Sequence, residues 1–190
     1  MALALPDKWI WDSWFAFDGT HHHVFYLQAS KSLVDPELRH RNPSVGHAIS
    51  TDLNNWTVLQ DALAPSDLAA FDSWTTWTGS VVKDDAGKWW MFYTGTSRED
   101  GGDIQRIGVA TSDDLINWTK HSTQPLVCAD YRWYEQLDKT IWHDEAWRDP
   151  WVFRFPQDAS TWHMLVTARS NEGEPRTRGV MGHATSKDLL

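Results

Sequence analysis

The chain has 190 residues, which is enough to bury one sizeable hydrophobic core. Acidic residues outnumber basic ones by 26 to 17, and the formal net charge is −9 at pH 7. This balance argues against nucleic acid as a partner, because binding to a phosphate backbone requires a basic surface.

In chain order, the predicted elements are short strands separated by turns. An entry strand near 14–17 is followed by an Asp-Gly turn, an aromatic and β-branched central strand over 23–29, and a third strand at 46–50. The same order recurs at 77–82, 88–95 and 107–111, and again at 148–155, 162–168 and 180–185. No helical period competes with this pattern, and the segment 131–139 allows at most one turn of helix.

A repeated unit marks the end of each third strand. It reads Gly-His-Ala-Ile-Ser-Thr-Asp-Leu from Gly46, Gly-Val-Ala-Thr-Ser-Asp-Asp-Leu from Gly108, and Gly-His-Ala-Thr-Ser-Lys-Asp-Leu from Gly182. The first two copies continue to a tryptophan and an outer strand. Repeats at a period of about 40 or more residues indicate an array or a propeller. We therefore predict an all-β propeller with about three blades, roughly 9–60, 74–121 and 147–190. Because three blades do not close a ring, we expect more chain after Leu190, or association of copies.

The entry strands carry the best candidates for chemistry. They begin with polar clusters, Trp-Asp-Ser-Trp at 11–14, Trp-Thr-Gly-Ser at 77–80 and Trp-Arg-Asp-Pro at 147–150. Entry strands line the funnel of a propeller, so Asp12 and Asp149 would converge there. Carboxylates facing each other in an aromatic pocket suit glycoside cleavage. The alternative is that both aspartates only cap turns.

Four ordered blocks of the chain resemble the invertase–levansucrase clan, glycoside hydrolase families 32 and 68. Family 32 opens with Trp-Met-Asn-Asp-Pro-Asn-Gly and then an aromatic strand ending in Phe-Tyr-Gln. Here Asp12 precedes Gln28 at a similar spacing, although Ser13-Trp14 is closer to the Trp-Asp-Ser/Thr-Trp version of levansucrases. The other blocks are Gly-His-Ala at 46–48, Trp-Thr-Gly-Ser at 77–80 with Phe-Tyr-Thr-Gly at 92–95, and Arg-Asp-Pro at 148–150.

The resemblance implies a five-bladed propeller and a retaining glycosidase or transferase that acts on β-fructofuranosides of the sucrose, levan or inulin type. By position, Asp12 resembles the nucleophile and Asp149 the residue that stabilises the transition state. The family's acid/base glutamate would lie after Leu190, and Glu145 is a weak substitute for it. Substrate-binding roles are implied for a set of residues near the entry strands: Trp11, Trp14, Gln28, Trp77, Ser80 and Arg148.

Two other functions remain open. One is an inverting arabinanase or xylosidase propeller, in which the first aspartate activates water. The other is a non-catalytic sugar-binding propeller segment, in which the aspartates only bind hydroxyls. Either way an oligo- or polysaccharide is the expected partner.

No cofactor, metal or membrane partner is expected. The adjacent histidines 21–23 alternate in direction and predict a solvated turn rather than a metal site, while a cation in the funnel is left open. Cys128 has no cysteine partner and predicts a thiol in a buried strand. No stretch approaches the roughly 18 apolar residues of a membrane span. The N-terminus lacks the basic region of a signal peptide, so we expect a cytoplasmic location, with secretion left open.

Overall fold

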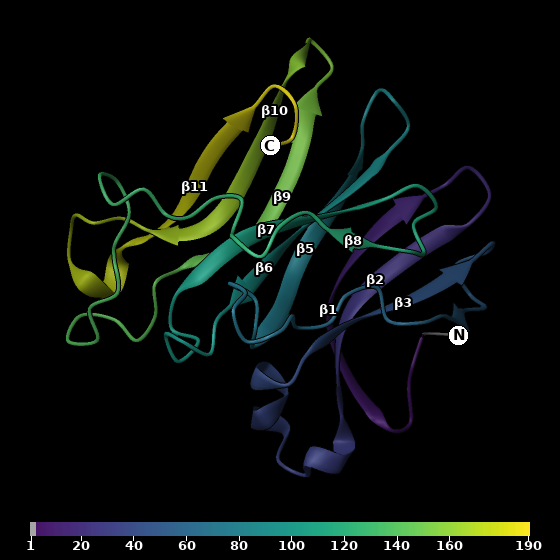
Figure 1. Ribbon diagram of the computed structural model, residues 1–190, viewed down its shortest axis with the longest axis horizontal. Coiled ribbons are helices and arrows are strands. Elements are labelled where there is room, and N and C mark those ends of the chain that lie inside the picture. Colours follow the sequence, from purple (N-terminus) through teal and green to yellow (C-terminus); the bar gives the residue numbers. More distant parts are fainter. Residues whose placement is uncertain (1–2) are drawn as a thin grey trace.

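The computed structural model describes residues 3–190, and strands account for nearly all of its regular structure (Figure 1). The strands are β1 (Lys8–Phe17), β2 (His22–Ser30), β3 (Ser44–Ser50), β4 (Thr57–Val58), β5 (Thr75–Lys83), β6 (Trp89–Thr96), β7 (Gln105–Ser112), β8 (Thr119–Lys120), β9 (Trp147–Phe155), β10 (Asp158–Arg169) and β11 (Gly179–Ser186).

The strands form three antiparallel sheets, each built from consecutive strands. Blade 1 has the order β1–β2–β3–β4, blade 2 has β5–β6–β7–β8, and blade 3 has β9–β10–β11. The first strand of blade 2, β5, packs against the first strands of both neighbours, β1 and β9 (Figure 1). The predicted all-β propeller fold is confirmed, and the number of blades in a closed ring stays a prediction.

The repeated Ser-x-Asp-Leu unit forms the same turn in all three blades. In blade 2, the Asp114 carboxylate accepts hydrogen bonds from the Ser112 hydroxyl at 3.0 Å and from the Asn117 backbone N–H at 2.8 Å. The leucine that follows each aspartate has a positive φ, at 61° for Leu53, 62° for Leu115 and 70° for Leu189. The repeat is therefore a structural device that turns the chain after each third strand.

The repeated glycine leaves room for an aromatic ring. A Cβ on Gly108 would lie 2.2 Å from the Phe71 ring, and the same addition at Gly182 would lie 2.6 Å from the Trp147 ring. These contacts explain why glycine recurs at the start of each unit.

The blades are held together by apolar layers between neighbouring sheets. Phe25 of blade 1 packs with Leu115 of blade 2, and Phe92 of blade 2 packs with Val152 and Leu189 of blade 3. An apolar cavity of about 150 Å³ lies in the second layer, lined by Phe92, Leu126, Val127, Val152, Trp162, His163, Met164, Ala184, Thr185, Ser186, Leu189 and Leu190. Neither Asp12 nor Asp149 lines this cavity.

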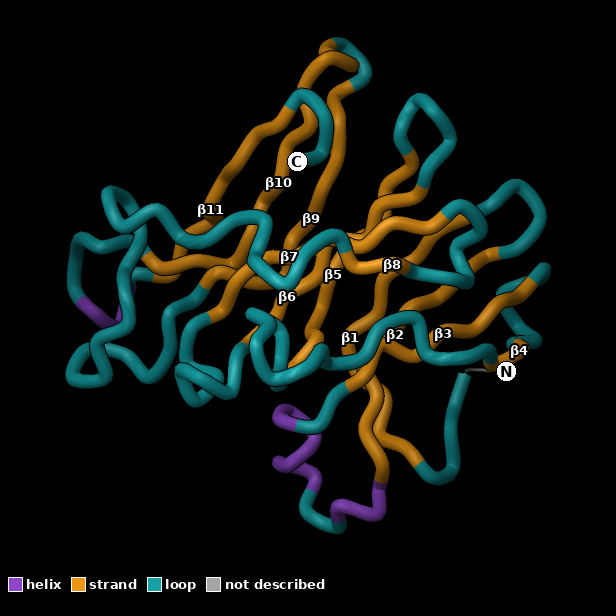
Figure 2. Tube along the Cα trace, in the orientation of Figure 1, coloured by secondary structure: helices purple, strands orange, loops and turns teal. Residues whose placement is uncertain are grey.

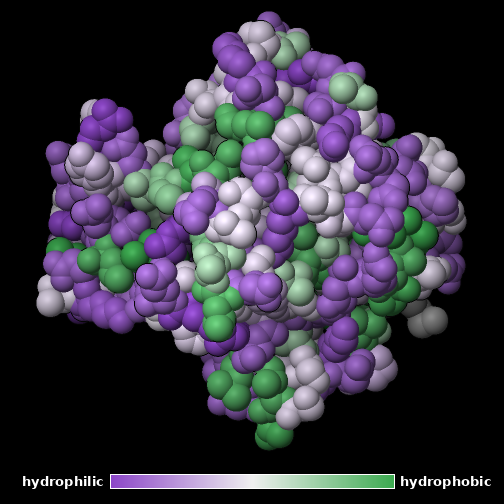
Figure 3. Space-filling view, in the orientation of Figure 1, coloured by the Kyte–Doolittle hydropathy of each residue, from purple (hydrophilic) through white to green (hydrophobic). Residues whose placement is uncertain are grey.

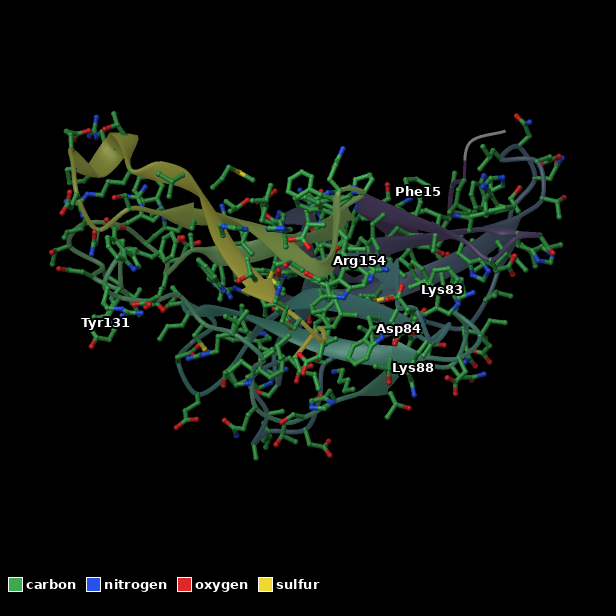
Figure 4. The ribbon with its side chains drawn as sticks, turned by 90° about the horizontal axis from the view of Figure 1, so that it is seen from above. Phe15, Lys83, Asp84, Lys88, Tyr131 and Arg154 are labelled. Carbon is green, nitrogen blue, oxygen red and sulfur yellow. The ribbon has the colours of Figure 1, made fainter. Side chains whose placement is uncertain are left out.

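An ion pair reinforces the contact between blades 2 and 3. Arg154 on β9 donates two hydrogen bonds to Asp85, at 2.8 and 2.6 Å, and its guanidinium lies over the Trp162 ring. Figure 4 shows Arg154 above Lys83 and Asp84 of the β5–β6 hairpin, far from the loop that carries Tyr131.

Three short 3₁₀ segments were not predicted: η1 (Lys31–Leu33), η2 (Pro36–Arg41) and η3 (Pro175–Thr177). Figure 2 shows that all three lie in loops outside the sheets. Apolar surface gathers over the η1–η2 loop, at the lower tip of Figure 3, where Val34 and Leu38 are exposed.

The structure corrects two expectations outside the site. Cys128 is exposed and lies in a loop, because the Pro125–Val127 segment forms only one isolated bridge, Val127 to Ile107. His23 is buried rather than solvated, because it belongs to β2 and its ring contacts His47. Within residues 3–190 the chain forms no helix with the length and apolar character needed to cross a membrane.

Candidate active site

The first strand of each blade is interrupted by a β-bulge at the same place. In β1 the register shifts between Trp11 and Ser13, so Asp12 has no partner on β2. In β5 the shift leaves Thr78 unpaired, and in β9 it falls at Asp149 and Pro150. A bulge takes its extra residue out of the regular backbone ladder and re-aims the side chain, and in each first strand this happens at a polar residue of the cluster.

Both aspartates have strained backbones. The φ angle is 37° at Asp12 and 58° at Asp149, in the left-handed region that non-glycine residues rarely adopt. Such strain persists only where the surrounding structure holds it, and it clusters at functional sites. The backbone at both aspartates is therefore held in an unusual conformation by its surroundings.

A glycine makes the bulge of blade 2 possible. A Cβ on Gly79 would lie 2.1 Å from the backbone oxygen of Phe92 on the paired strand. The Thr-Gly pair at 78–79 therefore lets β6 approach closely while Thr78 projects away from the ladder.

Hydroxyl groups join the three bulges. The Thr78 hydroxyl donates to Asp12 Oδ2 at 2.6 Å, which links blade 2 to the carboxylate of blade 1. The buried Thr94 hydroxyl donates to the Thr78 carbonyl oxygen at 3.2 Å and accepts from the Asp149 backbone N–H at 2.9 Å. The chain of contacts runs from Asp12 through Thr78 and Thr94 to Asp149.

Asp149 lies in a mixed electrostatic setting. Burial raises the pKa of this carboxyl, while the Arg148 guanidinium, whose Nε lies 3.4 Å from Asp149 Oδ2, and a hydrogen bond with Thr167 lower it. The negative charge of Asp12 also raises the pKa of Asp149. The convergence of the two carboxylates on one funnel stays a prediction, which the hydrogen bonds through Thr78 and Thr94 support.

Arg148 is held from the side opposite Asp149. Its Nη1 donates to Gln105 Oε1 at 3.0 Å, and Gln105 Nε2 donates to Asp144 Oδ2 at 2.8 Å. Gln105 is buried, so this arrangement fixes the guanidinium beside Asp149.

Two of the predicted binding tryptophans lie beside η2. The Trp77 indole donates to the His40 carbonyl oxygen at 2.9 Å, and the Arg41 guanidinium lies 5.9 Å from its ring centre. Trp11 meets the His40 ring edge-on at 5.9 Å and has Arg39 over its face. Both rings are partly exposed, which suits a pocket wall.

The structure places three other predicted binding residues inside the protein. Trp14 is 4% exposed and stacks on Phe25 in the core between blades 1 and 2, so we assign it to packing. The buried Gln28 donates to Asp61 Oδ1 at 2.6 Å, and the buried Ser80 hydroxyl accepts from the Val152 N–H at 3.1 Å. Substrate contacts by Gln28 and Ser80 stay predictions.

The Glu145 carboxylate accepts a hydrogen bond from the backbone of its own loop. Its Oε2 accepts from the Leu137 N–H at 2.9 Å. Among residues 3–190, no three or more histidine, cysteine, aspartate and glutamate side chains are grouped to hold a metal ion.

Sequence reasoning missed the threonines of the site. Thr78 follows Trp77 as Asp12 follows Trp11, and this alignment of the first two entry clusters could have identified it. Thr94 and Gln105 carry no comparable signal, because their roles depend on contacts between blades.

Comparisons with known proteins identify the family of the chain. The model of the glycosyl hydrolases family 32 N-terminal domain matches residues 6–190. An insoluble β-fructofuranosidase isoenzyme of Arabidopsis thaliana is 30% identical over 97% of this chain and 30% of its own length. A 6(G)-fructosyltransferase of Asparagus officinalis is 30% identical over 89% of this chain and 25% of its own length.

Solved structures show the same fold. Fructan 1-exohydrolase IIa of Cichorium intybus superposes with a TM-score of 0.72 at 23% identity, over 99% of this chain and 32% of that one. A levansucrase of B. subtilis gives a TM-score of 0.75 at 15% identity, over 97% of this chain and 55% of that one. The chain thus spans less than a third of the curated relatives named above. From the match over residues 6–190 and the similarity to these relatives, the chain belongs to glycosyl hydrolase family 32 and corresponds to its N-terminal domain.

Proposed function

We propose that the protein cleaves β-fructofuranosides by a retaining mechanism, with Asp12 as the nucleophile and Asp149 as the residue that stabilises the transition state. The observation that carries this proposal is the pair of strained, bulged aspartates joined by Thr78 and Thr94. Membership of family 32 supports the fructoside substrate.

In the first step, an Asp12 oxygen attacks the anomeric carbon of the fructosyl unit. A carboxylate–carbon bond forms while the glycosidic carbon–oxygen bond breaks, and the leaving oxygen takes a proton from a general acid. The Thr78 hydroxyl holds Asp12 Oδ2, which orients the other oxygen toward the sugar. Asp149 and Arg148 would bind the sugar hydroxyls. These contacts would become stronger as positive charge develops on the sugar ring in the transition state.

In the second step, water or a sugar hydroxyl attacks the same carbon and releases Asp12. A general base takes the proton of the attacking group, so the configuration at the anomeric carbon is retained overall. By the family resemblance we place this acid/base group on a glutamate after Leu190, in a propeller of five blades. The relatives include both a fructofuranosidase and a fructosyltransferase, and we propose water as the principal acceptor.

The test is sugar release by the intact gene product from sucrose, inulin and arabinan. We expect fructose from sucrose or inulin, and Asp12→Asn should lower that rate at least about 10³-fold, as loss of a nucleophile does elsewhere. Asp113→Asn is the control, because Asp113 is exposed in a turn and far along the chain from the bulges.

Release of arabinose would favour the inverting alternative. Binding of the sugar without turnover by the wild-type protein would favour the non-catalytic one. An Asp12→Asn variant with wild-type activity would also refute the proposed nucleophile.

A further inference from the structure

Thr94 lies at the junction of the two bulges that hold the active-site backbone. It is on β6, its side chain is fully buried, and its register partner on β5 is Trp77, beside the bulge. A hydroxyl has one donor hydrogen and two acceptor lone pairs, so it can donate and accept at once. Thr94 does both, toward the Thr78 carbonyl and from the Asp149 N–H.

These two backbone groups belong to residues that a bulge removes from the regular ladder. The extra residue of a bulge is unpaired, and a buried backbone group without a partner is costly. Thr94 supplies the partner for the Asp149 N–H, at a residue whose φ of 58° needs support from its surroundings.

We propose that Thr94 is a positioning residue that sets the relative placement of Asp12 and Asp149. Its hydroxyl fixes the Asp149 backbone directly, and it fixes Asp12 through Thr78, whose own hydroxyl binds the carboxylate. This inference rests on the proposed function, since it gives Thr94 a role in the reaction of that site.

If Thr94 only stabilised the fold, removal of its hydroxyl should have the same effect as removal of the hydroxyl from any other buried threonine of β6. Thr96 provides this comparison, because it lies two residues further along β6, on the same face, and is also fully buried. Its hydroxyl pairs with the Thr75 hydroxyl at 2.7 Å, away from the bulges. Thr96→Val therefore removes a buried hydroxyl contact without touching Thr78 or Asp149.

The experiment compares Thr94→Val, Thr94→Ser and Thr96→Val in the intact gene product, with kcat, KM and Tm measured for each. We expect Thr94→Val to lower kcat about 10- to 100-fold with KM within about threefold, since small displacements of reacting groups have effects of this size. Thr94→Ser, which keeps the hydroxyl, should restore kcat to within about threefold of wild type. Thr96→Val should lower Tm about as much as Thr94→Val and leave kcat near wild type.

Equal kcat values for Thr94→Val and Thr96→Val would overturn the proposal, as would a Thr94→Ser variant as impaired as Thr94→Val. A crystal structure of Thr94→Val gives a readout that does not depend on activity. The proposal predicts that Asp149 leaves its positive φ or that the Thr78 bulge shifts, and an unchanged backbone at both residues would refute it. A wild-type protein that releases no fructose would refute the proposed function instead, and the crystallographic result would still decide the role of Thr94.

Discussion

The two candidate catalytic residues are the same amino acid in different surroundings. Asp12 is exposed and receives a short hydrogen bond from Thr78, whereas Asp149 is partly buried beside Arg148. Environment alone can therefore give the two carboxyls different roles, as it does in other glycosidases.

Removal of the Arg148 charge should move the acid limb of activity to higher pH. The guanidinium lowers the pKa of Asp149, so the pKa rises in Arg148→Gln, and the ionised form is then lost at a higher pH as the solution is acidified. The measurement is kcat/KM against pH, whose limbs report groups of the free enzyme. Arg154→Gln is the control, because Arg154 pairs with Asp85 at the far end of β9. An acid limb that stays in place or moves to lower pH would contradict this assignment.

The sequence predicted the carboxylates of the candidate site, but it did not predict the residues that hold them in place. Asp12, Arg148 and Asp149 could be identified from short motifs on predicted entry strands. Thr94 could not, because a buried threonine in an aromatic strand has no local signal of a bond to another blade. Trp14 was predicted to bind substrate but packs in the core. A tryptophan next to site residues in the sequence can serve either purpose, and the sequence does not distinguish them.

The element that makes the site is the bulged first strand of each blade. Bulges in β1, β5 and β9 remove Asp12, Thr78 and Asp149 from regular strand pairing at matching positions. The local pattern of alternating residues predicted the strands but not these shifts, because a bulge depends on pairing with the next strand. The η2 segment was also missed, although Asp35 and Pro36 form a capped helix start, with Asp35 accepting from the Glu37 N–H.

Gly79→Ala tests the geometry of the second bulge. The added Cβ would collide with the Phe92 carbonyl oxygen, so β5 or β6 must shift. We expect the free energy of unfolding to fall by about 1–3 kcal/mol, the usual cost of overpacking, and kcat to fall with it. Urea denaturation and steady-state kinetics measure the two effects. Gly179→Ala, where the Cβ meets nothing within 4 Å, should leave both near wild type. A fully stable and active Gly79→Ala protein would show that the bulge tolerates a side chain.

The whole molecule is a series of blades whose repeated turns and glycines give the same local structure three times. This repetition is why the propeller fold could be predicted from sequence. The contacts between blades could not, because they join residues of separate sheets, such as the Thr78 hydroxyl of blade 2 and Asp12 Oδ2 of blade 1, which lie 2.6 Å apart.

Acid should destabilise the protein through His47. Burial between blades 1 and 2 lowers the pKa of His47 from 6.5 to about 4, with a smaller contribution from His23. The unfolded state therefore binds the proton more readily, and stability falls as the pH decreases from about 6.5 to about 4, by about 3 kcal/mol for a shift of this size.

Urea denaturation at several pH values should show a flatter pH dependence for His47→Gln than for the wild type. His183→Gln is the matched control, because His183 makes the same ring contact with His163 on blade 3 but is exposed. An unchanged slope for His47→Gln would show that this histidine is not the acid-sensitive group.

In the proposed mechanism the bulged Asp12 forms a covalent bond with a fructosyl unit. The most direct measurement is rapid acid quenching of the intact gene product during turnover of sucrose, followed by peptide mass spectrometry. We expect a peptide carrying one fructosyl residue esterified to Asp12, and this peptide should be absent from Asp12→Asn. An adduct on another carboxylate, or turnover with inversion and no adduct, would contradict it.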